Sequence, residues 1–422
     1  MYTHHSFCPY FLQNLFWEDK GMKRIALMLM IALLLSGCSK EERPSLRVWV
    51  GDNADVPWME QVIRDFRAAH PEKDVDIRIG VQNEGDVAKT VLADIESAAD
   101  VFTFADDQLP DLLSAGALTP IQGDVDALRN ANTPESIQAA TGPDGTLYAY
   151  PATADNGYFL FYNSAYITRE DAASLERLLD RAAENGKQAA IPLTNAWYLY
   201  AFFAGAGLEM RLSDDGVTNL CTWNAADTPI TGVQVAQSLL TIASHPGFTN
   251  ADSDAFVAGL KDGSIVAGVS GTWNASVAAQ IWGENYAAAK LPTFPVDNQE
   301  VQMASFSGFK LVGVNAYSNH AGAAMDLAAF MTGYEAQLDR FRLRRQGPSN
   351  VAALASPEVQ KEPAIAAIIA QAPYADVQRV GSKYWDAAAA LGKIIVSGNP
   401  DQTDLQTLLD QCVAGITAPA DQ

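Results

Sequence analysis

The sequence is poor in the residues that most metal centres and nucleophilic enzymes use. Among 422 residues there are four cysteines and five histidines. The cysteines are Cys8, Cys38, Cys221 and Cys412. None of them forms a C-x-x-C pair, so a thiolate zinc site or a thioredoxin-like redox site is not expected. Beyond the first 38 residues histidine occurs only at positions 70, 245 and 320. These three are too few and too far apart in sequence to predict a histidine-based metal centre or a catalytic triad.

Basic residues are scarce as well. The chain has 28 lysines and arginines against 50 aspartates and glutamates, and its net charge is −22. Phosphate contacts need clustered basic side chains, so we expect no nucleic-acid partner. An acidic body also repels anionic lipid, which argues against electrostatic adhesion to a membrane. The charge otherwise indicates solubility.

Long apolar runs are missing too. The run Ile25–Leu35 has eleven residues, whereas a membrane-spanning helix needs about 20. Because it follows Met22-Lys23-Arg24, it is typical of a secretion signal that starts at Met22. The next residues, Leu35-Ser36-Gly37-Cys38, resemble the bacterial lipobox, in which the cysteine is lipidated. We therefore expect a leader over 1–38, a palmitate-type lipid on Cys38, a tether over 39–44, and an extracytoplasmic protein anchored to the cell membrane.

The usual enzyme signatures are incomplete. Gly268–Thr272 (GVSGT) lacks the last glycine of the G-x-S-x-G nucleophile motif. Gly205 and Gly207 follow a helical segment rather than a strand, which argues against a dinucleotide loop. We therefore expect no enzyme, no cofactor and no metal. One alternative stays open, because Asp106, Asp107 and Asp155 could supply the paired carboxylates of a secreted glycoside hydrolase.

The rest of the chain alternates strand and helix patterns. Strands are predicted over 46–50, 75–79 and 101–104, with helices over 57–69 and 86–97 between them. This β-α-β-α-β order indicates the α/β class, with a parallel sheet and helices on both of its faces. Further helices are expected over about 169–185, 196–206 and 230–244, and the length suggests two or three domains of roughly 150 residues.

Four loops place aromatic residues beside polar ones. They are Asp155-Asn156-Gly157-Tyr158, Asn195-Ala196-Trp197-Tyr198, Gly271-Thr272-Trp273-Asn274 and Tyr384-Trp385-Asp386. A sugar ring stacks its C–H face on an aromatic side chain, while carboxylates and amides bind its hydroxyls. A single tryptophan of this kind is as compatible with core packing as with a site, but four such loops together favour sugar binding.

Several segments, taken in order, resemble one family. They include 100–118, GTLYAYP at 145–151, Tyr162-Asn163, the stretch from 250 to Trp273, SGFKLVGVNA at 307–316 and Tyr384-Trp385. In these segments the chain is similar to the extracellular solute-binding proteins of sugar ABC transporters, of the maltose-binding type. The similarity covers nearly all of the chain after the leader.

The resemblance implies a two-lobed periplasmic-binding-protein fold, each lobe a mostly parallel sheet flanked by helices. By analogy lobe one is 45–153 plus 305–332, and lobe two is 154–304 plus 333–422. A ligand in the cleft is trapped by hinge closure, and membrane subunits of an ABC importer then receive it. A monomer is expected, and Cys221 and Cys412 could be bridged within lobe two.

The resemblance also implies site residues. Trp273 and Trp385 would be stacking platforms, with Tyr198 or Trp197 as a third. Asp107 would bind sugar hydroxyls from lobe one, and Asp155 near the hinge would do the same, beside Asn156 and Tyr158. Gln108 and Phe104 stand where maltodextrin binders often have arginine and tryptophan, so the resemblance implies an oligosaccharide, maltodextrin-like or related, rather than maltose itself.

The main rival within the same fold is a protein that binds a polyamine or another cation. Acidic and aromatic side chains would also suit an ammonium ligand through cation–π contacts. The neutral polar neighbours Asn156, Asn195, Thr272 and Asn274 favour a sugar.

Overall fold

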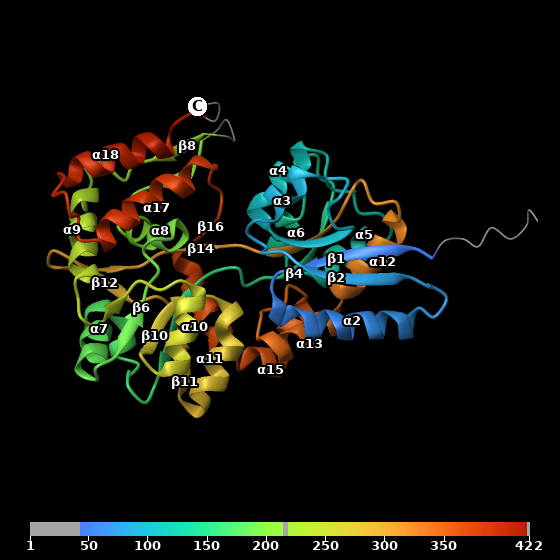
Figure 1. Ribbon diagram of the computed structural model, residues 1–422, viewed down its shortest axis with the longest axis horizontal. Coiled ribbons are helices and arrows are strands. Elements are labelled where there is room, and N and C mark those ends of the chain that lie inside the picture. Colours follow the sequence, from blue (N-terminus) through green and yellow to red (C-terminus); the bar gives the residue numbers. More distant parts are fainter. Residues whose placement is uncertain (1–42, 214–217, 420–422) are drawn as a thin grey trace, which may run out of the picture. The chain divides into compact units, whose positions relative to one another are not determined.

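The computed structural model describes residues 43–213 and 218–419 (Figure 1). Met22, the leader and Cys38 lie outside the described residues. Within these ranges no helix has the length and apolarity needed to cross a bilayer. Ser45–Gln422 forms a compact unit of its own, and this unit holds two five-stranded sheets, each with its own core.

The sheet of the first lobe has the order β2-β1-β3-β15-β4. The strands are β1 (Ser45–Val50), β2 (Asp76–Val81), β3 (Val101–Ala105), β4 (Ala149–Thr153) and β15 (Lys310–Val314). β1 pairs in parallel with β2 and β3, as the strand–helix alternation predicts. β15 returns from much later in the chain and runs antiparallel to β3 and β4. β1, β2, β3 and β4 therefore share one direction, as expected for a mostly parallel sheet, and β15 alone runs in the opposite direction.

Helices cover this sheet, and most of them bury apolar side chains against it, although α5 (Val125–Ala131) has no buried residue. The apolar residues of α2 (Val56–Ala69), among them Trp58, Val62 and Phe66, recur at helical spacing and are buried. The other helical segments are η1 (Asn53–Asp55), α3 (Val87–Ala93), η2 (Asp106–Gln108), α4 (Leu109–Ser114), α5 (Val125–Ala131), α6 (Pro134–Ala139) and α12 (Ala321–Met331). Each fully buried large apolar side chain contributes about 1.5–3 kcal/mol, and these side chains form the core of the first lobe.

The sheet of the second lobe has the order β11-β5-β10-β6-β9. The strands are β5 (Phe159–Asn163), β6 (Gln188–Ala190), β9 (Phe248–Thr249), β10 (Ile265–Ser270) and β11 (Tyr286–Ala289). β5 is antiparallel to both of its neighbours, whereas β10, β6 and β9 are parallel. The two-lobed α/β fold is confirmed, with mixed sheets in both lobes.

The helices of the second lobe lie around this sheet (Figure 1). They are η3 (Asp171–Ala173), α7 (Leu175–Glu184), α8 (Ala196–Gly205), α9 (Gly232–Ala243), α10 (Ser253–Asp262), η4 (Thr272–Asn274), α11 (Ala275–Trp282), η5 (Gly283–Asn285), α16 (Pro363–Gln371), η6 (Ala372–Tyr374), α17 (Lys383–Val396) and α18 (Leu405–Ile416). Three strand pairs complete it: β7 (Met210–Leu212) with β8 (Asn219–Cys221), β12 (Thr293–Val296) with β13 (Gln299–Gln302), and β14 (Ser305–Ser307) with β16 (Ala375–Val377).

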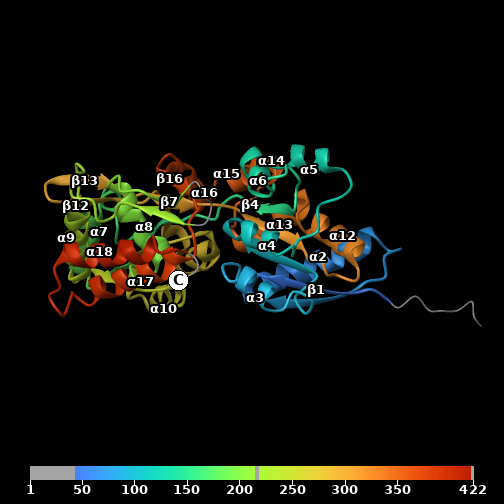
Figure 2. The ribbon, with the colours of Figure 1, turned by 90° about the horizontal axis from the view of Figure 1, so that it is seen from above.

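The predicted lobe boundary at residue 333 differs from the structure. α13 (Tyr334–Arg344) packs against η1, α2 and α12 of the first lobe and also touches α11 of the second. The segment continues through α14 (Val351–Leu354), which Figure 2 shows beside α6, and the Thr133 N–H donates to the Ser349 carbonyl. α15 (Pro357–Gln360) then leads to α16 in the second lobe. The first lobe therefore gains 334–354, and β14 at 305–307 belongs with the second lobe because it pairs with β16.

Buried ion pairs explain why α13 belongs to the first lobe. Arg340 lies 3.4 Å from Glu84 and 3.8 Å from Asp55, and Arg344 donates to Asp55 at 3.0 Å. Lys310 of β15 pairs with the same Glu84 at 2.5 Å. Burial raises the pKa of Glu84, but the charges of Lys310 and Arg340 outweigh it and hold that pKa below its ordinary value. All members of this network are nearly inaccessible to water, so none can lose its partner cheaply.

We expect Arg340→Met to destabilise the protein by up to about 3–5 kcal/mol, because it removes the buried cation that Glu84 and Asp55 share and leaves them only Lys310 and Arg344. Arg342→Met is the matched control on the same helix. The Arg342 side chain is 49 % exposed and pairs with Asp339 and Glu358, and loss of exposed pairs costs less than about 1 kcal/mol. Urea unfolding of both variants measures the difference. Equal losses would show that burial of the network is not what matters.

Candidate functional site

Four aromatic side chains of the second lobe gather in one place. We call Tyr158, Trp197, Tyr198 and Trp273 the aromatic cluster. The ring of Trp197 lies 4.6 Å from that of Tyr158, 5.1 Å from Tyr198 and 5.7 Å from Trp273, centroid to centroid. Three of the four predicted aromatic–polar loops therefore meet.

The local sequence explains how the two tryptophans are held. The Asn195 side chain caps α8 by accepting from the Trp197 N–H at 2.9 Å, which fixes Trp197 in the first turn. Trp273 lies in η4 after Gly271, where a Cβ would come within 2.0 Å of the indole ring. Asn274 donates to the hydroxyls of Ser270 and Ser253, both at 2.9 Å. The polar residues next to these two tryptophans thus stabilise the loops through hydrogen bonds.

Exposure divides the predicted aromatic residues into two groups. Tyr158 and Tyr198 are buried, at 1 % and 8 % exposure, and form the inner part of the aromatic cluster. Trp197, Trp273 and Trp385 are half-buried and keep surface for a ligand. Trp385 stands apart from the cluster and contacts Tyr384 at 5.1 Å and Phe306 at 6.5 Å.

The first lobe brings charged groups toward these rings. Lys310 lies with its Nζ 5.8 Å from the centroid of the Trp273 ring. Asp107 in η2 accepts from Gln378 Nε2 at 2.6 Å, and Gln378 Oε1 accepts from Trp197 Nε1 at 2.6 Å. One glutamine of the second lobe thus joins a predicted ring to a predicted carboxylate. Nothing in the sequence pattern singles out Gln378, Arg379 or Lys310, because their neighbours in space are far away in sequence.

Asp155 and Asn156 lie on a chain crossing. The Asp155 carboxylate accepts from the Gly347 N–H, and the Ala154 N–H donates to the Gly347 carbonyl at 3.0 Å, so the crossing after β4 is tied to the loop between α13 and α14. It is 2 % exposed, and its Oδ1 has no hydrogen-bond partner among the described residues. Asn156 is half-buried, and its N–H donates to the Gly308 carbonyl.

The two adjacent carboxylates of η2 have perturbed pKa values. Burial, and then the charge of Asp106, raise the pKa of Asp107 to about 7. Burial also raises the pKa of Asp106, although Arg379 at 3.0 Å opposes this. Asp107 therefore titrates near neutral pH.

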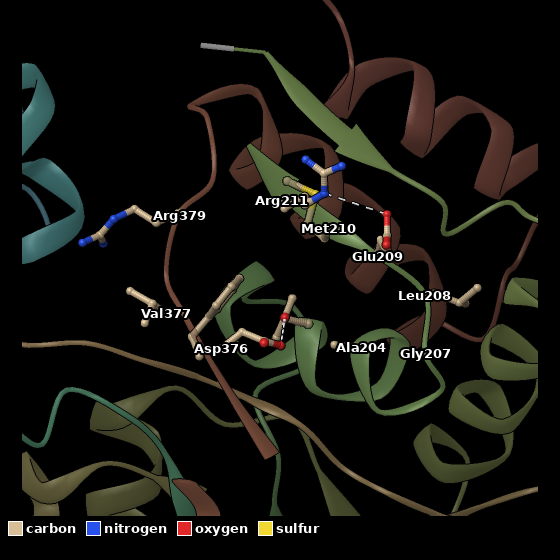
Figure 3. Close-up of a pocket in the computed structure, with 11 residues that line it drawn as sticks. Ala204, Gly207, Leu208, Glu209, Met210, Arg211, Asp376, Val377 and Arg379 are labelled. Atoms are coloured by element: carbon tan, nitrogen blue, oxygen red, sulfur yellow. Dashed lines mark hydrogen bonds and ion pairs between the residues drawn. The ribbon is translucent and has the colours of Figure 1, made fainter. Parts of the chain in front are cut away.

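A pocket of about 390 Å³ adjoins this region in the second lobe. Figure 3 shows Asp376, Val377 and Arg379 on one side of it and Glu209 to Arg211 on the other. Arg379 extends away from this pocket toward the first lobe, where it reaches Asp106. Tyr200, one turn after Trp197 on α8, lines the pocket and donates to Asp376 at 2.6 Å. None of the predicted ligand-binding residues lines it.

The remaining expectations concern cysteines and metals. Cys221 and Cys412 are free thiols, so the bridge that the spacing left open is not formed in this structure. Burial raises the pKa of both to about 12, which keeps them protonated. In the described part of the chain no group of three or more His, Cys, Asp or Glu side chains could hold a metal ion.

Comparisons with known proteins identify the family. Residues 61–367 match the bacterial extracellular solute-binding proteins, and the chain belongs to this family. It is 24 % identical over 375 residues to a galactooligosaccharide-binding protein of Bacillus subtilis (strain 168), with 82 % of this chain and 84 % of that protein covered. The resemblance seen in the sequence is thereby confirmed.

Solved structures support the same fold. A structure with acarbose is 28 % identical, with a TM-score of 0.78, and the match covers 89 % of this chain and 99 % of that one. The maltodextrin-binding protein MalE1 from L. casei BL23, solved without ligand, is 26 % identical, with a TM-score of 0.71 and the same coverage.

The raised pKa of Asp107 predicts a pH-dependent stability. Because the folded protein keeps a proton here that the unfolded chain releases near pH 4, this contribution is fully present below about pH 4 and is lost as the pH rises to about 7. Asp107→Asn removes the titration. Calorimetry at pH 5 and pH 8 should show the melting temperature of the variant rising relative to wild type at the higher pH. A difference that is the same at both values would contradict the assignment.

Proposed function

We propose that this protein binds an oligosaccharide, with a maltodextrin-like sugar favoured, between its two lobes, and that it delivers the sugar to an ABC importer. One observation carries the proposal. The half-exposed rings of Trp197 and Trp273 lie 5.7 Å apart, and the Asp107 carboxylate of the other lobe is linked to Trp197 through a single side chain. Rings that stack on pyranose faces, next to an acceptor for hydroxyls, form the combination that sugars require.

The relatives support the class of ligand. Their names refer to galactooligosaccharide, acarbose and maltodextrin, which are sugars or sugar mimics of several units. Phe104 and Gln108 bear on the choice among them. Phe104 is fully buried, and Gln108 is 7 % exposed and holds the η2 loop by donating to the Glu84 carbonyl. Both side chains are thus used within the first lobe, and the favoured ligand is an oligosaccharide rather than maltose specifically.

Delivery to a transporter follows from the family and from the two lobes. The chain crosses between the lobes after β4, between β14 and β15, and between α14 and α16. Such connections allow hinge closure around a ligand. The proposed partners are the sugar and the membrane subunits of an importer, with a monomer acting without cofactor and without catalysis.

Two alternatives make different demands on the site. A polyamine would lie near Lys310 and Arg379, and these cations already occupy the carboxylates of Glu84 and Asp106 that an ammonium group would need. A glycoside hydrolase would use a protonated carboxylic acid, which Asp107 resembles. The hydrolase is tested by recovery of the sugar, since a transport protein returns it uncleaved.

The first experiment is calorimetric titration of residues 45–422 with maltose, maltotriose, longer maltodextrins, galactooligosaccharides and spermidine. We expect binding of a sugar series and none of spermidine. Trp273→Ala and Trp385→Ala should each weaken sugar binding at least tenfold, which corresponds to about 1.4 kcal/mol. Tyr317→Ala is the matched control, because Tyr317 is 52 % exposed in the first lobe and lies outside the site. Binding of spermidine alone, or unchanged affinity in both tryptophan variants, would refute the proposal.

We also propose a lipid anchor on Cys38, supported by the lipobox-like LSGC segment after the apolar run. Stable attachment of a water-soluble domain to a membrane needs two membrane-binding elements, such as two acyl chains on one protein. Cys38→Ser should move the protein from the membrane fraction to the soluble fraction of its host. Wild-type protein found only in the soluble fraction would contradict the anchor.

A further inference from the structure

Two pairs of consecutive side chains meet between the lobes. Asp106 and Asp107 lie in η2 of the first lobe, and Gln378 and Arg379 follow β16 in the second. Gln378 Nε2 donates to Asp107 Oδ2 at 2.6 Å, and Arg379 Nη1 donates to Asp106 Oδ2 at 3.0 Å. We call these four residues the interlobe clamp.

Each half of the clamp is fixed by its own lobe. Asp106 Oδ1 accepts from the Phe309 N–H at 2.8 Å. The Gln378 N–H donates to the Ser307 carbonyl at 3.0 Å, and the Leu212 N–H donates to the Arg379 carbonyl at 3.1 Å. Asp106, Gln378 and Arg379 are therefore each held by a hydrogen bond to a backbone group near them, apart from the contacts within the clamp. The clamp exists when the two lobes meet and is absent when they part.

The amide of Gln378 has one usable orientation. The indole N–H of Trp197 can only donate, and the carboxylate of Asp107, when ionised, can only accept. Gln378 is 7 % exposed and satisfies both with one oxygen and one nitrogen. Turning the amide over would break both bonds. A shorter or non-polar side chain could not reach both partners.

We propose that Gln378 is a positioning residue of the binding site: it couples closure of the lobes to the orientation of Trp197 and Asp107, with Arg379 and Asp106 securing the same contact. This inference rests on the proposed function. Gln378 occupies Asp107 Oδ2 and leaves Oδ1 for a ligand hydroxyl, and it holds the Trp197 ring from its N–H edge. Closure of the lobes thus fixes the orientation of the Trp197 ring and of the Asp107 carboxylate. The entropy lost when a ligand binds to them is smaller for that reason.

Gln378→Glu is the sharpest test, because it keeps the size of the side chain and the acceptor for Trp197. It replaces the donor to Asp107 with a second carboxylate. At pH 8 the two like charges repel, and the nearby Arg379 is already paired with Asp106. We expect residues 45–422 without ligand to show a larger radius of gyration by X-ray scattering, and maltotriose to bind at least about tenfold more weakly.

Two further variants separate positioning from general damage. Asp107→Asn combined with Gln378→Glu exchanges donor and acceptor, since the asparagine amide introduced at position 107 can then donate to the new carboxylate, and the radius of gyration should return to that of wild type. Gln406→Glu is the matched control. Gln406 donates to Asp410 at 3.0 Å within the second lobe, so this change also puts two carboxylates together but should leave the scattering and the affinity unchanged.

The outcomes are distinct. A larger radius for Gln378→Glu, its reversal in the double variant and an unchanged control support the clamp. Equal scattering and equal affinity for Gln378→Glu and wild type at pH 8 overturn it. If wild-type protein binds neither maltotriose nor any other sugar of the panel, the proposed function and the positioning role fail together, while scattering still reports whether the contact holds the lobes.

Discussion

The first lobe depends on one buried glutamate. Glu84 pairs with Lys310 on β15 and with Arg340 on α13, so a single carboxylate holds two elements of the segment 310–354, which returns from the second lobe. Burial disfavours its charge, and the two cations restore it. The return segments carry the crossings that join the lobes. Asp155 and Asp106 then accept from the backbone N–H groups of Gly347 and Phe309, which lie in this same returning part of the chain.

The two lobes contribute different chemistry to the candidate site. The second lobe supplies the rings of Trp197 and Trp273 on a rigid helix start and a short 3-10 turn. The first lobe supplies carboxylates at the end of β3 and the ammonium group of Lys310. A ligand that uses both sets must draw the lobes together, which is how binding energy becomes a conformational signal.

Sequence periodicity predicted the local elements well. The helices expected near 196–206 and 230–244 are α8 and α9, and the β-α-β-α-β start is present. The antiparallel direction of β15 and the placement of α13 were not predictable from the sequence. They depend on ion pairs between residues about 250 positions apart, and such pairs produce no local sequence pattern. The aromatic cluster was predictable since tryptophan beside Asn and Gly is unusual for a core. Gln378 was not, because its role depends on partners in two other segments.

The position of β15 has a consequence for biogenesis. This strand lies between β3 and β4 in the sheet, yet it is formed by residues 310–314. A chain that emerges with its N-terminus first cannot close its first sheet until nearly three quarters of its length has appeared. Long-range pairing of this kind folds slowly, and β4 has no neighbour in this sheet until β15 is present. Such a delay suits a polypeptide that must remain unfolded until it has passed through a membrane channel.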